Sequence, residues 1–361
     1  GEHASAKGDH SMPSRKRAVM IGTGGFGGWW LHSFLPRFAG ELEIAAIADV
    51  NAEARSAAGE LLGLETSKCF ADMHEAMAKA DAELCIVVIP PAHHREAILA
   101  ACERGLHILT EKPIADTWEA CLDIYHAVRS AGVKCQVVQN YRFAPHNLTL
   151  KQAIQEGRIG QLVYVVGRFA ADYRTRGAWG MFRHEMPHGL LVEGAVHHLD
   201  QIRNLTGADC SMVAGWDWNP GHGSFDGECC ALLTLRMETG VHAQYEGHCL
   251  AAGWRNAWYE EAYRAEGLEG SLVVDRDQTV RLLQHRPGRG LRTEELTTLQ
   301  PEYASHQAII RQFLDWLDGG PEPPTAIEDN IRSAALLFGA IRASETHAVV
   351  DVGQLVRQVQ A

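Results

Sequence analysis

Long apolar runs are missing from this chain of 361 residues. None approaches the roughly 20 consecutive apolar residues that a membrane-spanning helix needs, so the sequence predicts no membrane partner. Basic charge is also scarce, because 33 Lys and Arg stand against 45 Asp and Glu, for a formal net charge of −12. Nucleic acids and anionic membranes bind basic patches. We therefore expect no nucleic acid as a partner either.

Cysteines at metal-binding or redox spacing are lacking as well. The nine cysteines show no CxxC pattern, and Cys229-Cys230 is the one adjacent pair. The first residues carry no apolar core of a signal peptide. An odd, dispersed set of cysteines without an export signal predicts reduced thiols and a cytoplasmic location. The polar residues 1–12, which end in an abrupt change at Met12, are interpreted as an expression-vector remnant before the native start.

What the chain does contain suits two domains, since its length exceeds that of one typical domain. Residues 13–140 alternate between strands and helices, which predicts an α/β Rossmann domain with a doubly wound parallel sheet. The expected strands are 17–21, 42–48, 84–89, 106–110 and 134–138, and the expected helices include 92–104 and 117–130.

The first strand runs directly into the segment Gly22-Thr23-Gly24-Gly25-Phe26-Gly27. Its glycines fit GxGxxG, in which Gly22 allows a tight turn, Gly24 lets pyrophosphate approach and Gly27 packs helix on strand. Asp49 ends the second strand, at the distance where an acidic residue binds the ribose hydroxyls and repels a 2′-phosphate. The motif therefore favours NAD. NADP stays an alternative because Arg55 is near, and Asp49 could instead cap a helix.

Glu111-Lys112-Pro113 follows the strand 106–110. The carboxyl edge of a parallel sheet is where ligands bind, and Pro113 favours an extended Lys112. A lysine held there can donate a hydrogen bond to a hydroxyl and stabilise a developing alkoxide. By itself the tripeptide would also suit a surface turn with an ion pair.

Residues 141–361 change from alternation to consecutive strands, expected at 162–170, 229–237, 241–248 and 270–275. This predicts an α+β domain with a large, mostly antiparallel sheet and helices on one face. A helix is expected over 189–207, where Glu193 and His197 share a face. A histidine steadied by a carboxylate can take the proton of an alcohol as its hydride leaves. The alternative is an ordinary helical pair.

His184-Glu185-Met186-Pro187-His188 matches the zinc pattern HExxH, which requires a continuous helix. Pro187 argues against that helix, so we expect no metal, although Glu193, His197 or His198 could supply a third ligand. We expect instead a loop that lines the substrate pocket, with His184 or His188 binding a hydroxyl or carboxylate. Trp179 precedes this loop and is the aromatic candidate for stacking on a sugar ring.

Taken together, these motifs resemble the glucose–fructose oxidoreductase/inositol dehydrogenase (Gfo/Idh/MocA) family over nearly the whole chain. The resemblance rests on spacing and order as well as on the residues themselves. The matching segments are Gly22 to Gly27, Pro90-Pro91-Ala92-His93-His94, Glu111-Lys112-Pro113, Glu193-x-x-x-His197-x-x-Asp200, 140–145 and 266–272.

The resemblance implies an NAD(P)-dependent oxidoreductase that moves a hydride between nicotinamide and a hydroxyl or carbonyl of a sugar, polyol or cyclitol. Lys112 would orient the substrate hydroxyl and His197 would act as general base, while Glu193 stands where many members carry aspartate. The implied cofactor-binding residues are Gly22, Gly24, Gly25, Phe26, Gly27, Asp49, Pro90, His94, Glu111 and Lys112. The implied substrate-binding residues are Arg142, Trp179, His184, His188, Glu193 and His197.

The family's second domain is an open-faced sheet that often mediates assembly, so a homodimer or homotetramer is expected. Two other functions stay open. Some relatives are glycosidases that use tightly held NAD in a transient redox cycle. The other alternative is a non-catalytic regulator that binds NAD(P) or another ligand.

Overall fold

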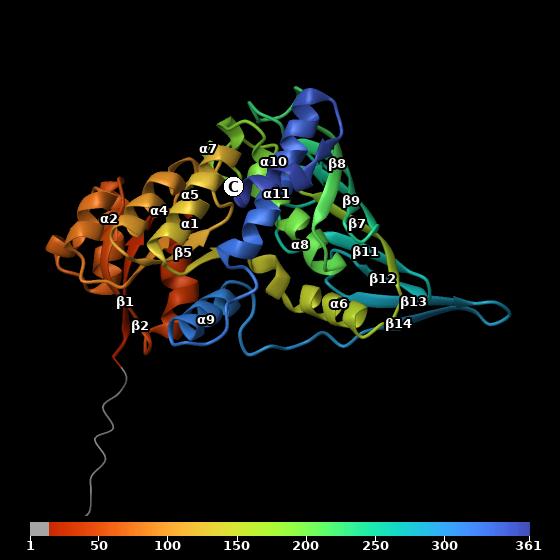
Figure 1. Ribbon diagram of the computed structural model, residues 1–361, viewed down its shortest axis with the longest axis horizontal. Helices are drawn as coiled ribbons and strands as arrows, with labels where there is room; N and C mark the ends of the chain where they lie inside the picture. The colour runs from red at the N-terminus through yellow and green to blue at the C-terminus, as the bar shows by residue number, and fades with distance from the viewer. Residues whose placement is uncertain (1–13) are drawn as a thin grey trace, which may run out of the picture.

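The computed structural model describes residues 14–361 and contains two sheets, one at each end of the molecule (Figure 1). The vector remnant expected at residues 1–12 lies outside the described residues. Helices α5 (Trp118–Ala131) and α10 (Ile327–Thr346) lie between the two sheets. The two halves of the chain thus form two units with helices packed between them.

The first sheet has six strands in the order β3-β2-β1-β4-β5-β6, and every pair is parallel. This confirms the predicted Rossmann fold with a doubly wound parallel sheet. The strands are β1 (Lys16–Ile21), β2 (Leu42–Ala48), β3 (Cys69–Phe70), β4 (Leu84–Val87), β5 (His107–Glu111) and β6 (Cys135–Val138). The helices are α1 (Phe26–Trp29), α2 (Ala52–Leu62), α3 (Met73–Lys79), α4 (His94–Glu103) and α5, and α1 continues into a π-helical turn η1 (Trp30–Phe34) and a 3-10 turn η2 (Leu35–Phe38).

Successive side chains of this sheet pack into two separate cores, as the period of two in a strand requires. Val19 and Ile21 of β1 pack in one core with α4 and α5, whereas Ala18 and Met20 pack in the other. The second core is completed by α9 (Ser305–Leu317), whose Ile309 and Phe313 are buried there. A helix far along the chain therefore covers one face of the N-terminal sheet.

The second sheet has nine strands in the order β14-β13-β12-β11-β7-β10-β9-β8-β15. Only the β7–β10 pair is parallel, which confirms the predicted large, mostly antiparallel sheet. The β13–β14 hairpin projects away from the body (Figure 1). The strands are β7 (Leu162–Ala170), β8 (Cys210–Trp218), β9 (Cys230–Met237), β10 (His242–His248), β11 (Ala262–Gly267), β12 (Gly270–Val274), β13 (Val280–Arg286), β14 (Gly290–Glu295) and β15 (Val350–Asp351).

Helices cover one face of this sheet, while the other exposes large apolar side chains such as Trp216 and Leu232. The expected homodimer or homotetramer through this face stays a prediction. The helical segments are α6 (Pro145–Gln155), α7 (Met181–Glu185), the π-helical η6 (Leu190–Ala195), α8 (Val196–Thr206), α10 and α11 (Val352–Val359).

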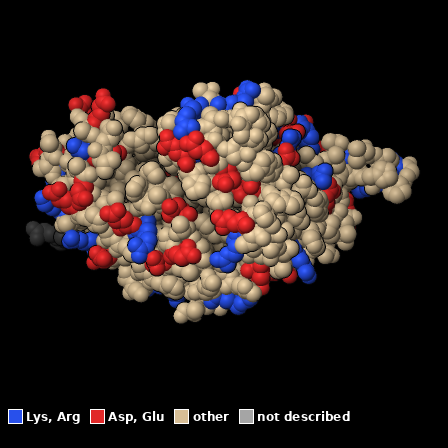
Figure 2. Space-filling model, turned by 90° about the horizontal axis from the view of Figure 1, so that it is seen from above, with Lys and Arg blue, Asp and Glu red and all other residues tan. Residues whose placement is uncertain are grey.

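Charges of both signs are interspersed over the face seen in Figure 2. Within residues 14–361, no helix combines the length and the apolar character that crossing a bilayer would demand. All nine cysteines are free thiols, and eight of them are buried.

Candidate active site

A cavity of about 780 Å³ lies where the carboxyl end of the N-terminal sheet meets the second domain. The glycine loop, the EKP segment, the helical segment 190–206 and residues 304–307 all contribute to its wall. Several predicted site residues meet here. They are Gly24, Gly25, Phe26, Pro90, Glu111, Lys112, Trp179, Glu193 and His197.

The glycine loop has no room for side chains at its turning points. A Cβ on Gly22, whose φ is 90°, would lie 2.1 Å from the Val88 carbonyl oxygen, and one on Gly27 would lie 2.5 Å from the Gly22 carbonyl oxygen. Gly24, Gly25 and Phe26 of this loop border the cavity. These residues therefore fit a dinucleotide, because close approach of backbone to pyrophosphate is what the motif provides.

Asp49 holds the glycine loop from the end of β2. Its Oδ2 accepts hydrogen bonds from the backbone N–H groups of Thr23 at 2.8 Å and Gly24 at 2.9 Å. Asn51, rather than Asp49, caps α2, since its side chain accepts from the Ala54 N–H. Asp49 thus lies beside the loop at the end of β2, and both of its carboxylate oxygens accept hydrogen bonds from backbone amides; its predicted contact with the ribose hydroxyls stays a prediction.

Lys112 and Glu193 form a buried ion pair in the wall of the cavity. The Lys112 Nζ lies 2.7 Å from the Glu193 Oε2 and 2.7 Å from the Glu193 carbonyl oxygen. The Glu193 side chain is only 2% exposed, and Arg183 Nε lies 3.6 Å from its Oε1. Burial alone would raise the pKa of this carboxyl, but the charges of Lys112 and Arg183 outweigh burial and lower the pKa. Glu193 is therefore a carboxylate that fixes Lys112.

The expected contact between Glu193 and His197 is replaced by this ion pair. Residues 190–195 form a π-helix, whose hydrogen bonds join residues five apart. The wider turn changes which side chains share a face, so the four-residue spacing does not bring the two groups together. His197 has other partners.

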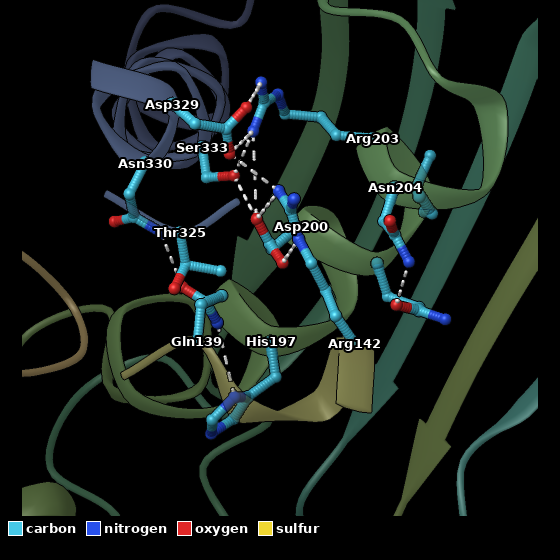
Figure 3. Close-up of polar contacts among 12 residues, drawn as sticks. Gln139, Arg142, His197, Asp200, Arg203, Asn204, Thr325, Asp329, Asn330 and Ser333 are labelled. Carbon is cyan, nitrogen blue, oxygen red and sulfur yellow. Dashed lines mark hydrogen bonds and ion pairs between the residues drawn. The ribbon is translucent and has the colours of Figure 1, made fainter. Parts of the chain in front are cut away.

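His197 is 6% exposed and stacks on the Tyr141 ring, with centroids 4.0 Å apart. Its Nδ1 lies 3.3 Å from Nε2 of Gln139, and Gln139 Oε1 accepts from Asn330 Nδ2 at 3.2 Å (Figure 3). Burial, and then the nearby positive charge of Lys112, keep the pKa of His197 well below its ordinary value. The imidazole is therefore neutral at physiological pH, and its one nitrogen without a hydrogen can accept a proton; the tautomer decides which nitrogen that is.

Aromatic side chains form another part of the wall. Tyr141 stacks between His197 and Tyr259, whose ring centroid is 4.4 Å away. Trp179 packs against Trp258 at a centroid distance of 5.4 Å. Sequence reasoning did not assign Trp258 or Tyr259 to the pocket, because nothing in their local pattern distinguishes them from core residues. Tyr141 follows β6 closely, so its place after a parallel strand is a usable signal.

Glu111, at the end of β5, lines the cavity and is held by side chains from two other segments. Its Oε1 accepts from Trp30 Nε1 at 2.9 Å and lies 3.3 Å from His306 Nε2. Burial would raise the pKa of Glu111, but His306 and Lys112 reverse this effect and lower it. His306 also stacks on Phe34 at 4.2 Å. No motif in the sequence indicates that residues 304–307 return to this cavity.

Two residues expected to touch ligands instead hold the walls of the cavity in place. His94 is fully buried, with Nδ1 2.9 Å from the Pro113 carbonyl oxygen and Nε2 2.8 Å from that of Ile89. It therefore joins the EKP turn to the segment before Pro90 and does not line the cavity.

Arg142 is also placed away from the cavity. Its guanidinium makes two 2.7 Å hydrogen bonds to Asp200 and a third, of 2.9 Å, to Asp329 of α10 (Figure 3). Arg203 joins the same buried network through Asp329. Bidentate pairing occupies the donors that a substrate would need, so Arg142 links α8 and α10 in this structure.

The histidines of the HExxH segment point away from each other and from the cavity. Helix α7 ends at Glu185, Met186 is extended, and His188 has a φ of 52°. His184 stacks on Phe225 at 4.2 Å, whereas His188 Nδ1 lies 2.7 Å from Asp217 Oδ2. The break at Pro187 is thus present, but the segment does not supply substrate contacts to the cavity.

Both halves of the chain match models of one protein family. Residues 16–139 match the GFO/IDH/MocA model described as "Oxidoreductase family, NAD-binding Rossmann fold". Residues 147–273 match the "GFO/IDH/MocA C-terminal domain". These matches confirm the resemblance drawn from the motifs.

Individual relatives agree with the family models. The chain is 36% identical over 351 residues to "Uncharacterized protein y4oX" of Sinorhizobium fredii, covering 94% of this chain and 97% of that one. It is 25% identical over 313 residues to 1,5-anhydro-D-fructose reductase of Ensifer adhaerens, covering 86% and 91%. The crystal structure of an oxidoreductase from Agrobacterium radiobacter in complex with NAD+, L-tartaric acid and magnesium has a TM-score of 0.82 at 18% identity, covering 95% and 100%, which shows a shared fold.

Proposed function

Because this chain belongs to the GFO/IDH/MocA oxidoreductase family and has its NAD-binding Rossmann domain, we propose that it oxidises or reduces a sugar, polyol or cyclitol at one hydroxyl or carbonyl group. The observation that carries the proposal is the placement of Lys112 and His197 in the wall of the cavity that the glycine loop also borders. One group can hold the reacting oxygen and the other can take its proton.

The glycine loop, residues 22–27, would hold the pyrophosphate of the dinucleotide, with Pro90 and Glu111 beside it in the same wall. When bound, the nicotinamide ring supplies the acceptor or donor of the hydride. Asp49 places a carboxylate against the loop amides. The negative charge of this carboxylate would repel the 2′-phosphate of NADP, which supports NAD as the preferred cofactor.

Lys112 has a positive charge and an N–H donor with which to bind the substrate oxygen. An ammonium group carries three N–H donors, and two are directed at the carbonyl and carboxylate oxygens of Glu193. The third is left for a substrate hydroxyl. Because the pair is buried, the positive charge is worth more to a developing alkoxide than it would be in water.

We infer that His197 exchanges the proton of that hydroxyl. Its low pKa keeps the ring neutral, and its stacking on Tyr141 fixes the plane of the ring. During oxidation the O–H proton goes to the imidazole and the C–H hydride leaves with its electron pair. Reduction reverses both transfers.

The wall of the cavity suits a carbohydrate-like molecule. Rings of Tyr141, Trp179, Trp258 and Tyr259 offer faces for C–H groups. Lys112, Arg183 and Asn140 offer hydrogen-bond donors in the same wall. The sugar reductase among the relatives supports the same substrate class.

A panel of sugars, inositols and sugar acids, each incubated with NAD while the absorbance of the reduced cofactor is followed, tests this proposal. At least one polyol should yield NADH, and the same compound should give less with NADP. If no member of the panel or its oxidised counterpart changed the redox state of the cofactor, the oxidoreductase assignment would fail. Release of free sugar from a glycoside without net NADH would mark a glycosidase instead.

A further inference from the structure

His188 lies in a group of acidic side chains outside the catalytic cavity. Its Nδ1 lies 2.7 Å from Asp217 Oδ2 and 3.6 Å from Glu228 Oε2. On the opposite side of the ring, Nε2 lies 3.3 Å from Glu345 Oε1. One ligand atom from each of His188, Asp217 and Glu228 can be chosen so that all three lie within 4.8 Å of one another. Three carboxylates thus surround one imidazole.

These residues come from distant parts of the chain and are held in place. Asp217 belongs to β8, Glu228 precedes β9 and Glu345 lies near the end of α10. The Glu228 Oε2 also accepts the backbone N–H of His188 at 2.7 Å, which explains how the positive φ of His188 is fixed. The rigid strands on either side give the group the preorganisation that an ion site needs.

Asp217 provides a second, independent observation that points to a bound cation. Only 8% of the residue is exposed, and its Oδ1 has no hydrogen-bond partner among residues 14–361. A buried carboxylate oxygen without a partner is costly. Asp217 lines a cavity of about 620 Å³ together with His188, Glu228 and Glu345. The cavity gives an ion and its water ligands a path to this group of side chains.

We propose that His188 Nδ1, Asp217 and Glu228 bind one divalent first-row transition-metal ion of the zinc class, with an open coordination position toward the cavity. Glu345 accepts the Nε2–H of His188 and directs Nδ1 toward the ion. Metal-bound histidines commonly donate their second N–H to a carboxylate in this way. One nitrogen and two carboxylate ligands with an open position form a donor set that zinc accepts.

The required movement is small. In a tetrahedral site with metal–ligand bonds of about 2.0–2.2 Å, neighbouring ligand atoms lie about 3.4 Å apart. The 3.6 Å between His188 Nδ1 and Glu228 Oε2 is close to this spacing, whereas the 2.7 Å contact with Asp217 has to lengthen by about 0.7 Å. A side-chain rotation provides this lengthening, and the third pair, Asp217 and Glu228, has ligand atoms within 4.8 Å of each other.

The HExxH pattern implies that both of its histidines bind one metal ion from a single helix. The proposed site differs, because only one histidine of the motif is a ligand. Its second histidine takes part, while His184 is turned toward Phe225 and Ser224. Sequence reasoning expected no metal, because it considered only ligands on one helix or nearby on the chain. The proposed carboxylate ligands are on β8 and before β9, and no spacing rule connects them with His188.

Zinc binding to the whole chain, stripped with EDTA and exchanged into chelator-free buffer, tests the site by isothermal titration with ZnCl2. We expect one ion per chain with a Kd on the order of 1 μM or below. Asp217→Asn and Glu228→Gln should each weaken binding by more than about 100-fold, and Glu345→Gln by about 10–100-fold as an outer partner. The partly exposed Glu228 makes Glu228→Gln the variant that tests the site if Asp217→Asn does not fold.

Glu185→Gln is the matched control, since Glu185 belongs to the same motif but is paired with Arg176 on the surface. It should bind zinc as the parent does. Cobalt loading provides a second check, because a thiolate-to-cobalt absorption band would indicate cysteine ligands and overturn the assignment. Absence of zinc binding at millimolar metal, or unchanged affinity in folded Glu228→Gln, would overturn it too.

Discussion

Two histidines nine residues apart in one segment meet opposite electrostatic surroundings. Burial, together with the positive charges of Lys112 and its neighbours, lowers the pKa of His197. Burial also acts against the charged form of His188, but Asp217, Glu228 and Glu345 outweigh it and raise the pKa to about 9. The same side chain is thus held neutral in one site and protonated in the other when no metal is bound.

The difference in pKa arises because the two imidazole rings point toward different parts of the structure. His188 precedes the π-helix and faces β8 and β9, whereas His197 follows it and faces the EKP turn. A neutral imidazole next to an ammonium group suits proton transfer from an alcohol. An imidazole among carboxylates suits a cation. The surroundings, rather than the histidine itself, decide the chemistry.

The largest expected effect is the loss of Lys112. Lys112→Ala removes the cation from the cavity and should reduce kcat by about 100- to 1000-fold, the range for losing one preorganised donor to a transition-state oxyanion. The affinity for NADH, followed by fluorescence titration, should stay within about twofold because the glycine loop is untouched. The exposed Lys68→Ala is the matched control and should keep full activity. An active Lys112→Ala variant would contradict the role of the site.

Removing the ammonium group also tests the electrostatic contrast. Without Lys112, one of the charges that lowers the pKa of His197 disappears. The pKa of His197 should therefore rise toward its ordinary value in Lys112→Ala, measured by NMR titration of the ring protons, while that of His188 should not change. Equal shifts of both histidines would break the comparison.

The buried neutral state of His197 should appear as a pH dependence of stability. Its pKa is lower in the folded than in the unfolded protein, so the unfolded chain binds the extra proton first as pH falls. This contribution to stability is fully present above about pH 6.5 and is lost below it, by up to about 1.4 kcal/mol per pH unit. His197→Asn should lack this slope. Urea unfolding of both proteins between pH 5 and 7 measures the difference, and parallel curves would refute the assignment.

Much of the fold and part of the site could be predicted because the signals are local. The glycine loop, Asp49 and the EKP turn each follow a parallel strand within a few residues, and strand order then brings them to one edge. The predicted general base His197 and its neighbour Lys112 also meet in one cavity.

The remainder depends on tertiary packing. Arg142 and His94 lie in suitable positions along the chain, but buried carboxylate and carbonyl partners turn their side chains away from the cavity. The π-helix of residues 190–195 changes the pairing of Glu193 in a way that periodicity does not reveal. The segment 304–307 reaches the cavity only because α9 crosses back to the first sheet.

Gln139 offers a smaller test of how His197 is positioned. Its amide lies 3.3 Å from Nδ1 of the ring and is itself bonded to Asn330. Gln139→Leu should lower kcat by about tenfold, the equivalent of one hydrogen bond, while the KM for NAD stays unchanged. Gln136→Leu is the matched control, since Gln136 is equally buried on β6 but bonds to Thr325. A loss of the same size in both variants would indicate general damage rather than positioning.

The smallest effect is expected at Asp49, where the question is charge rather than catalysis. Asp49→Asn keeps an oxygen that can accept from the loop amides of Thr23 and Gly24 but removes the charge that opposes a 2′-phosphate. For a partly exposed charge the gain is about 1 kcal/mol or less, so the Kd of NADPH should fall by about fivefold at most relative to that of NADH. Paired fluorescence titrations measure this ratio. Arg55, which donates to the Asp49 carbonyl oxygen at 2.8 Å, should supply the cation for that phosphate. Adding Arg55→Ala to Asp49→Asn should therefore cancel the gain, and a gain that persisted would show that Arg55 takes no part in cofactor choice.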